Sequence, residues 1–224
     1  MNLAGLDWGC IAAALDERGC ATTGPILTDS ECAALIATYD DDARFRSRVV
    51  MARHNYGRGE YRYFAYPLPD TVTSLRAALY PPLAEIANRW EGGFPPEHAA
   101  YVARCHEAGQ TRPTPLLLKY GAGDYNRLHQ DLYGDLVFPL QATILLSDPN
   151  EFEGGEFVMT ETHPRTQSRV EVVPLAQGEA VIFAVNRRPL KTARGTAKVA
   201  MRHGVSRLRA GKRFTLGIIF HDAK

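Results

Sequence analysis

The residues best suited to chemistry in this chain are a closely spaced histidine and aspartate, His129 and Asp131, and a second histidine far downstream, His203. Residues i and i+2 of a strand point to the same face, so His129 and Asp131 can aim at one point. Two histidines and one carboxylate can hold one face of an octahedral iron ion and leave three positions open for other ligands. An isolated His-x-Asp unit also arises by chance as a surface pair, so the neighbouring residues must decide between these interpretations.

A second group of residues has the chemistry that binds a carboxylate. Arg213 stands ten residues after His203 at the start of a long apolar run, and Thr215 shares its strand face. The planar guanidinium group matches a carboxylate, and the threonine hydroxyl can add a donor. Tyr120, nine residues before His129, can reach the same group. We expect these three residues to bind the distal carboxylate of 2-oxoglutarate; the alternatives are a surface arginine at a strand end and a tyrosine of the core.

These residues belong to a series of short motifs that extends over about residues 114 to 222. The motifs are YGAGDYNRLHQD at 120–131, EGGEF at 153–157, GEAVIF at 178–183, HGV at 203–205 and GKRFTL at 211–216. In this order they resemble the prolyl-hydroxylase branch of the iron(II)- and 2-oxoglutarate-dependent oxygenases. The last residues, 216–223, resemble a bacterial group of such oxygenases that is labelled as acting on damaged nucleic acid.

The resemblance implies a double-stranded β-helix, or jelly roll, with iron(II) held by His129, Asp131 and His203 and 2-oxoglutarate held by Arg213 and Tyr120. The implied reaction couples oxidative decarboxylation of 2-oxoglutarate by O₂ to hydroxylation of a protein prolyl group or a small molecule, with ascorbate as a reductant. The short interval between His203 and Arg213 favours this branch, while oxidative demethylation of damaged nucleic acid is the alternative. A second alternative is a sensor barrel that binds a metal or ligand without turnover, but a separate carboxylate clamp favours an enzyme.

Apolar periodicity predicts helices in the first half of the chain. Residues 5–18, 70–90 and 96–108 have helical spacing, and Thr28 begins a capping box that predicts a further helix. Residues 46–66 are typical of a strand pair, because their second arm is rich in aromatic strand formers.

After Pro113 the pattern of apolar residues changes to short runs separated by Gly, Pro, Asn and Asp. This pattern is typical of a β-sandwich or β-barrel. We therefore predict an α+β protein. A helical and β extension at residues 1–112 packs on a jelly-roll core at residues 113–224, and the N-terminal helices cover one sheet.

Composition and charge give broader limits. The 224 residues carry 26 basic and 25 acidic side chains, so whole-chain charge favours neither a nucleic acid nor any other charged partner. Its cysteines, Cys10, Cys20, Cys32 and Cys105, form no CxxC pair, which is typical of free thiols in a reducing compartment. The first residues include acids and no basic start, and no apolar run approaches roughly 20 residues, so we expect a cytoplasmic protein without a membrane partner.

Two weaker features indicate where a substrate could bind. No acidic residue occurs between Ala180 and His221, whereas this stretch contains Arg187, Arg188, Lys191, Arg194, Lys198, Arg202, Arg207, Arg209, Lys212 and Arg213. Such a block attracts phosphates or acidic peptides, or forms a solvated lid; Arg188 and Lys191 are our candidate contacts. In the second, aromatic strand predicted within residues 46–66, Tyr61 and Tyr63 either stack on a flipped base or pack on the barrel.

Overall fold

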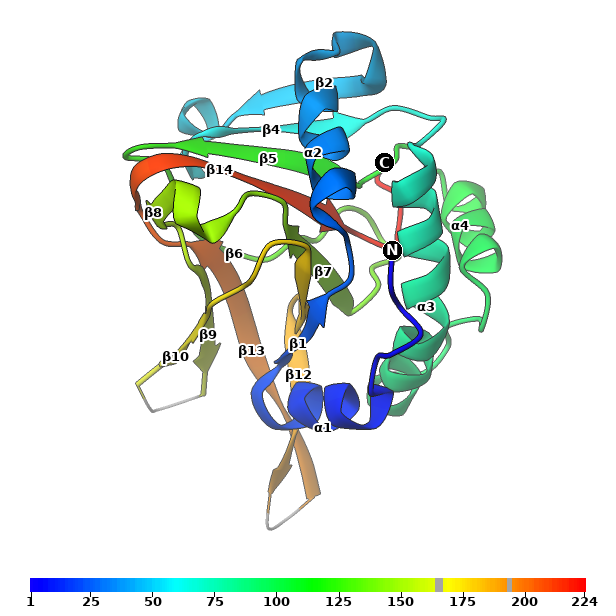
Figure 1. Ribbon diagram of the computed structural model, residues 1–224. Coiled ribbons are helices and arrows are strands. Elements are labelled where there is room, and N and C mark those ends of the chain that lie inside the picture. The colour runs from blue at the N-terminus through cyan, green and yellow to red at the C-terminus, as the bar shows by residue number, and fades with distance from the viewer. Residues whose placement is uncertain (164–166, 193–194) are drawn as a thin grey trace.

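The computed structural model describes residues 1–163, 167–192 and 195–224 (Figure 1). Its α-helices are α1 (Trp8–Arg18), α2 (Asp29–Ala37), α3 (Asp70–Trp90) and α4 (His98–Glu107). Short 3₁₀ helices are η1 (Thr38–Asp40), η2 (Asp42–Arg44), η3 (Met51–His54) and η4 (Pro149–Glu151). The strands are β1 (Cys20–Pro25), β2 (Phe45–Val50), β3 (Gly57–Arg58), β4 (Glu60–Phe64), β5 (Leu116–Gly121), β6 (Tyr125–His129), β7 (Leu140–Leu145), β8 (Phe152–Gly154), β9 (Phe157–Thr162), β10 (Arg169–Val173), β11 (Glu179–Ala184), β12 (Arg187–Thr192), β13 (Gly195–Val205) and β14 (Leu208–Ile218).

The strands form two antiparallel sheets. The larger has eight strands in the order β1-β11-β7-β14-β5-β4-β2, with β8 paired to β14. The smaller has six strands in the order β10-β9-β13-β6-β3, with β12 paired to β13. Consecutive elements cross between the sheets, since β5 lies in the larger sheet and β6 in the smaller one. The predicted mixture of helices and antiparallel strands is confirmed.

Alternation along the strands gives the larger sheet two different faces. Side chains of successive residues point to opposite faces of a sheet. Ile144 of β7 and Leu216 of β14 belong to the buried apolar cluster that also contains residues of all four helices. Their neighbours Thr143 and Thr215 line a cavity on the other face, toward the smaller sheet. This face, together with the smaller sheet, carries the candidate site.

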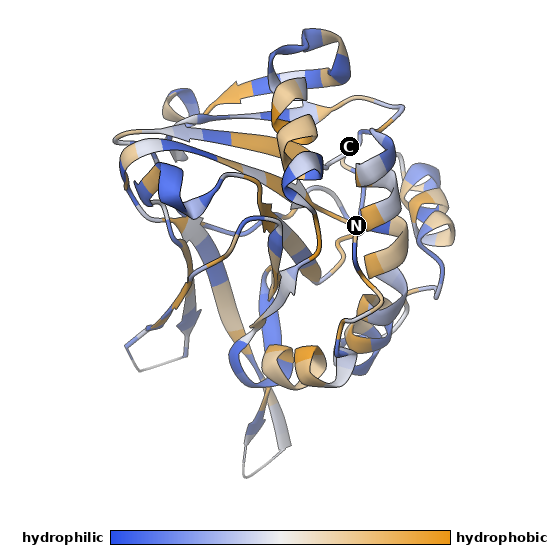
Figure 2. Ribbon diagram, viewed as in Figure 1, coloured by the Kyte–Doolittle hydropathy of each residue, from blue (hydrophilic) through white to orange (hydrophobic). Residues whose placement is uncertain are grey.

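The helices cover the outer face of the larger sheet, as the apolar pattern predicts. In Figure 2 the hydrophobic segments lie mainly in the helices and in the central strands that they cover. The capping box of α2 is present, with Thr28 accepting from the amide of Glu31 and the Glu31 carboxylate accepting from the amide of Thr28. Helix α3 continues through Pro81 and Pro82 without a break. None of the described helices combines the length and the hydropathy needed to cross a membrane.

The first 112 residues contribute more to the sheets than a packed extension would. Strand β1 pairs with β11, and β4 pairs with β5, so both enter the larger sheet. Strand β3 pairs with β6 at the edge of the smaller sheet. Strands from both sides of residue 112 therefore share each sheet. Hydrogen bonding between distant strands joins the two segments that the sequence pattern separates at residue 112.

Candidate metal centre

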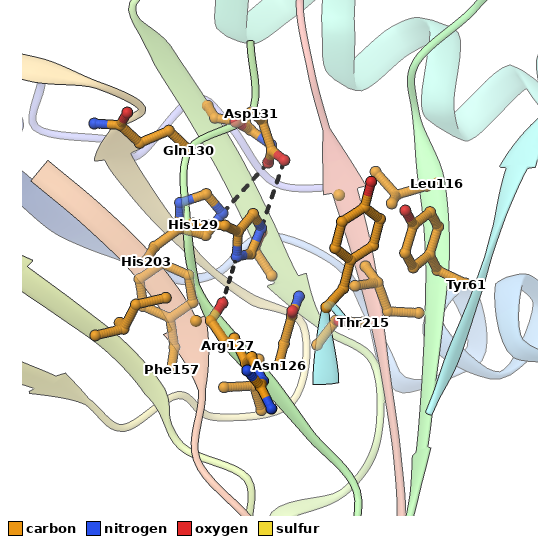
Figure 3. Close-up of a pocket in the computed structure, with 18 of the residues that line it drawn as sticks. Tyr61, Leu116, Asn126, Arg127, His129, Gln130, Asp131, Phe157, His203 and Thr215 are labelled. Carbon is orange, nitrogen blue, oxygen red and sulfur yellow. Dashed lines mark hydrogen bonds and ion pairs between the residues drawn. The ribbon is translucent and has the colours of Figure 1, made fainter. Parts of the chain in front are cut away.

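His129, Asp131 and His203 meet between the two sheets. Their candidate ligand atoms all lie within 4.8 Å of one another, and the triad is mostly buried (Figure 3). His203 of β13 is the register partner of His129 of β6, which places the two imidazole centroids 4.2 Å apart. The Nε2 atoms of His129 and His203 lie 3.5 and 3.3 Å from the two carboxylate oxygens of Asp131. The structure thus brings together the three residues that the sequence singles out.

Two neighbouring side chains hold the Asp131 carboxylate. The hydroxyl of Tyr133 donates to Oδ1 at 2.6 Å, and Nε2 of Gln141 donates to Oδ2 at 2.8 Å. Burial acts to raise the pKa of Asp131, but His203, His129 and the Tyr133 hydroxyl stabilise the anion and hold the pKa below its ordinary value. The carboxylate is therefore charged at neutral pH and fixed in position.

The histidines present nitrogen lone pairs to the same point. Nδ1 of His129 lies 2.7 Å from the carbonyl oxygen of Arg127 and donates to it, so the proton occupies Nδ1 and leaves Nε2 free to bind a metal. Burial lowers the pKa of His203, which keeps its imidazole neutral. The ring of His203 also stacks on Phe157 at 5.9 Å between centroids, which fixes its plane.

The triad opens into a cavity of about 350 Å³ between the sheets. Five aromatic side chains line it besides the histidines and come from both sheets and the connecting segments: Tyr56, Tyr61, Tyr120, Tyr133 and Phe157. Asn126 and Thr215 add polar groups to the lining (Figure 3). The volume lies within the range of small-molecule sites, and the aromatic lining suits a planar ligand.

Arg213 is a buried cation without a counterion. Its side chain is 2% exposed, and no described acidic residue forms an ion pair with it. Its Nη1 atom is buried and has no hydrogen-bond partner among the described residues. Burial lowers its pKa to about 10, which leaves the guanidinium charged at neutral pH.

Tyr120 stands directly opposite Arg213 across the β5–β14 pair. Its hydroxyl is also buried without a partner among the described residues, and the guanidinium carbon lies 5.9 Å from its ring centroid. Burial raises the pKa of Tyr120, so its hydroxyl stays a neutral donor. Tyr120 and Thr215 both line the cavity, which connects this unsatisfied polar group to the triad.

The residues predicted to contact a substrate lie in different environments. Tyr61 lines the cavity, while Tyr63 is buried behind Tyr133 with ring centroids 6.2 Å apart. Arg188 is 2% exposed and bound to the Glu161 carboxylate, with Nε at 2.7 Å from Oε2. The structure therefore does not bring Arg188 to the cavity, because β12 turns this side chain inward toward α1. Lys191 is exposed on β12 and does not line the cavity either.

Several functional candidates were missed in the sequence. Tyr133 follows the His-x-Asp unit by two residues. Gln141 is a polar residue within the apolar run of β7, and this exception to the pattern is a signal that could have identified it. Two further histidines, His163 and His221, do not belong to the cluster and have other partners. His163 binds Glu161 at 2.6 Å, and Nδ1 of His221 accepts from the amide of Phe138 at 3.2 Å.

Solved oxygenase structures share this fold. A prolyl-4-hydroxylase of Pseudomonas putida is 14% identical with a TM-score of 0.58, over 94% of this chain and 96% of that chain. An oxidoreductase of the 2OG-Fe(II) oxygenase family from Burkholderia pseudomallei is 18% identical with a TM-score of 0.58, over 100% and 96% of the two chains. The non-haem α-ketoglutarate-dependent epimerase SnoN is 16% identical with a TM-score of 0.59, over 94% and 80%.

Sequence comparison identifies the family of this chain. Two uncharacterized proteins from strains of Mycobacterium tuberculosis are each 45% identical over 190 residues, which is 80% of this chain and 82% of theirs. Residues 59–223 match the model of a family described as "Oxygenase, catalysing oxidative methylation of damaged DNA". The match confirms that the motifs between residues 114 and 222 mark an oxygenase. The chain belongs to the Oxygenase-NA family.

Proposed function

We propose that this oxygenase uses iron(II) and 2-oxoglutarate, with the metal held by His129, Asp131 and His203. The observation that carries the proposal is Arg213, a buried guanidinium without an ion-pair partner among the described residues. Arg213 does not itself line the cavity, but its guanidinium carbon lies 5.9 Å from the ring of Tyr120, which does. A buried charge without a partner is destabilising, so an anionic ligand of small size is the natural partner of this group. A sensor that binds only a metal has no use for such a residue.

The donor set fits a divalent first-row metal. Two neutral imidazoles and one carboxylate supply three ligands and leave positions open for a bidentate co-substrate and O₂. A bound iron(II) would activate O₂, so that one oxygen atom would enter a C–H bond of the substrate and the other would enter the succinate that forms, with CO₂, from 2-oxoglutarate. The protein orients the ligands: Arg127 sets the tautomer of His129, and Tyr133 and Gln141 fix Asp131.

Arg213, Tyr120 and Thr215 would hold the far carboxylate of 2-oxoglutarate. A guanidinium group binds a carboxylate through two parallel hydrogen bonds, and the hydroxyls supply further donors. This assignment uses the unsatisfied atoms Nη1 of Arg213 and Oη of Tyr120. Two facing antiparallel sheets with a metal between them are typical of the double-stranded β-helix, which we propose as the architecture of the core.

For the prime substrate we propose a base of damaged nucleic acid, with a prolyl group or a small molecule as the second candidate. The description of the family supports the first, and the aromatic cavity suits a planar ring. The second candidate derives from the interval between His203 and Arg213 and from the fold shared with prolyl hydroxylases. Oxidation of a methyl group on a base and hydroxylation of a ring carbon use the same metal chemistry, so the proposed metal site would serve either reaction.

The test is succinate release from 2-oxoglutarate by the iron-loaded protein in the presence of ascorbate. Methylated oligonucleotides, free methylated nucleosides and proline-containing peptides are compared as stimulants. Asp131→Ala removes the only anionic ligand of the triad and should abolish release. Asp135→Ala, an exposed aspartate nearby, is the matched control and should retain it. Equal succinate release by the parent protein and the Asp131→Ala variant would overturn the proposal.

A further inference from the structure

The mouth of the cavity exposes apolar side chains that a protein normally covers. Tyr56, which lines the cavity, is 51% exposed, and Leu128, another lining residue, is 44% exposed. Leu132 lies between the lining residues Asp131 and Tyr133 and is 47% exposed. Large apolar groups gathered at the entrance of a site indicate that a partner packs there.

Exposed arginines lie on the chain segments that contribute residues to this mouth. Arg53 lies in η3 and Arg58 in β3, on either side of Tyr56 in the chain. Arg127 of β6 lines the cavity, and its amide donates to the carbonyl of Tyr56 at 2.8 Å. Figure 3 shows Arg127 on the side of the cavity away from Asp131. All three arginines are exposed, and none forms an ion pair with an acidic residue in the described part of the chain.

The fold places these groups in a defined arrangement. Asn55 ends η3 in the left-handed region at φ 61°, which turns the chain so that Tyr56 reaches the cavity. Strand β3 then pairs with β6 at the edge of the smaller sheet. The rings of His54 and Tyr56 stack at 5.4 Å with an interplanar angle of 22°. The mouth thus combines a preformed aromatic platform with unpaired positive charge.

This combination fits a single strand of nucleic acid. Proteins that bind single strands pair cationic side chains with phosphates and stack bases on aromatic rings. Asp131 and His203 are only 7% and 6% exposed, so a base must leave a duplex before it can reach the triad. An acidic peptide would use the arginines but leave the stacked rings without a planar partner.

We propose that Arg53, Arg58 and Arg127 bind the phosphates that flank the target base, and that Tyr56 stacks on a neighbouring base. The partner is single-stranded nucleic acid, and the inference rests on the proposed oxidation of a base. The surface adjoins the metal site, to which Arg127 contributes only its backbone carbonyl, so replacement of the Arg127 side chain leaves that hydrogen bond to His129 available.

The basic stretch near β12 is the alternative surface for binding nucleic acid, but several of its charges are already paired or lie away from the cavity. Arg188 is buried on Glu161, and Lys198 pairs with Glu91 at 2.9 Å. Arg194 lies outside the described residues. Arg187 and Lys191 remain exposed on β12, and neither lines the cavity. They therefore provide a matched control, because their replacement changes the charge of the protein as much as replacement of two mouth arginines.

The experiment measures binding of a fluorescein-labelled single-stranded oligonucleotide by anisotropy, without iron or O₂, at several salt concentrations. The variant R53E/R127E is compared with R187E/K191E. We expect the mouth variant to bind at least about tenfold more weakly, with the slope of log affinity against log salt reduced by about 1.4, since each phosphate contact contributes roughly 0.7. The control variant should stay within about twofold of the parent, because its charges make no direct contact.

Stacking is tested at Tyr56. Tyr56→Ala should weaken binding about tenfold, as expected for the loss of one stacked base, while Tyr56→Phe retains the ring and should bind like the parent. Thermal unfolding midpoints equal to that of the parent show that each variant is folded. A mouth variant that is folded and binds like the parent would overturn the inference, as would a control variant that binds more weakly than the mouth variant.

A competition experiment distinguishes a surface that binds nucleic acid from one that binds a peptide. An acidic peptide of the same net charge as the oligonucleotide should fail to displace it at equal concentration; equal displacement would identify a peptide surface and overturn the inference. Failure of the proposed function is distinguishable, because succinate release from 2-oxoglutarate is measured on the parent protein. A parent that releases succinate but shows no mouth-dependent binding overturns only the surface. A parent that binds through the mouth but releases no succinate overturns only the chemistry.

Discussion

The hydroxyl of Tyr133 donates a 2.6 Å hydrogen bond to Oδ1 of Asp131, two residues before it in the chain. Burial, together with the adjacent carboxylate, raises the pKa of Tyr133, so the hydroxyl remains a neutral donor. Gln141 holds the other oxygen, and the two residues leave the carboxylate little freedom to rotate. In the proposed metal centre, Tyr133 would therefore position the Asp131 carboxylate.

We predict that Tyr133→Phe weakens metal binding by roughly 10- to 100-fold, because loss of a group that orients a ligand typically costs this much affinity. Titration calorimetry with cobalt(II) measures the effect without turnover. Tyr61→Phe is the control, since it removes a hydroxyl from the same cavity without touching Asp131. Unchanged cobalt affinity in Tyr133→Phe would show that Gln141 alone orients the carboxylate.

The second prediction concerns the co-substrate. Arg213→Lys keeps the charge but loses the planar fork, so the apparent KM for 2-oxoglutarate should rise by roughly tenfold or more. The readout is succinate release at increasing 2-oxoglutarate concentration. Arg209→Lys on the exposed part of β14 is the matched control and should leave this KM unchanged. An increase caused by Arg207→Ala and not by Arg213→Lys would transfer the role to Arg207.

A third prediction tests the structural role of Arg188. Arg188→Ala removes the buried partner of Glu161, which keeps only His163 at 2.6 Å and the exposed Arg169 at 3.5 Å. The free energy of unfolding should therefore fall by about 2 kcal/mol, the contribution expected of a charged hydrogen bond. Urea denaturation measures this loss. The double variant R188M/E161Q removes both charges and should recover part of it. A cost below about 1 kcal/mol, the range of exposed ion pairs, would contradict the burial of this pair.

The fourth prediction is a dependence of stability on pH. Nε2 of His98 lies 3.0 Å from the carbonyl oxygen of Phe220, and burial lowers the pKa of His98 from 6.5 to about 4. The unfolded state therefore binds a proton at higher pH than the folded state. The stabilisation is complete above about pH 6.5 and is lost as the pH falls toward about 4.

His98→Gln retains a donor toward Phe220 and removes the titrating ring, so it should flatten the decline of the unfolding free energy across this window. His221 has its pKa lowered to about 4 by burial as well, so part of the slope should remain. Urea denaturation at several pH values in this range provides the measurement, with the exposed His54→Gln as control. Equal slopes for the parent and His98→Gln would contradict the role of His98.

Local signals in the sequence predicted several elements well. The capping box at Thr28 and the helical spacing of residues 70–90 depend on contacts within a few residues, and both helices form as expected. The His-x-Asp unit likewise places two candidate metal ligands close together through local geometry. The oxygenase family also followed from the sequence, because the ordered motifs after Pro113 are together specific to it.

Tertiary structure decided what the pairing of distant strands controls. Only the β6–β13 register sets His203 opposite His129, and only the β5–β14 register sets Tyr120 opposite Arg213. Strand alternation puts Arg188 and Lys191 on opposite faces of β12, and the elements that pack on this strand decide that the face of Arg188 is the buried one. The sequence does not show whether a strand turns a charged side chain toward solvent or toward a buried carboxylate, because the residue type is the same in both cases. Spacing along the chain determines which side chains share a strand face, whereas burial and counterions depend on the elements that pack across that face.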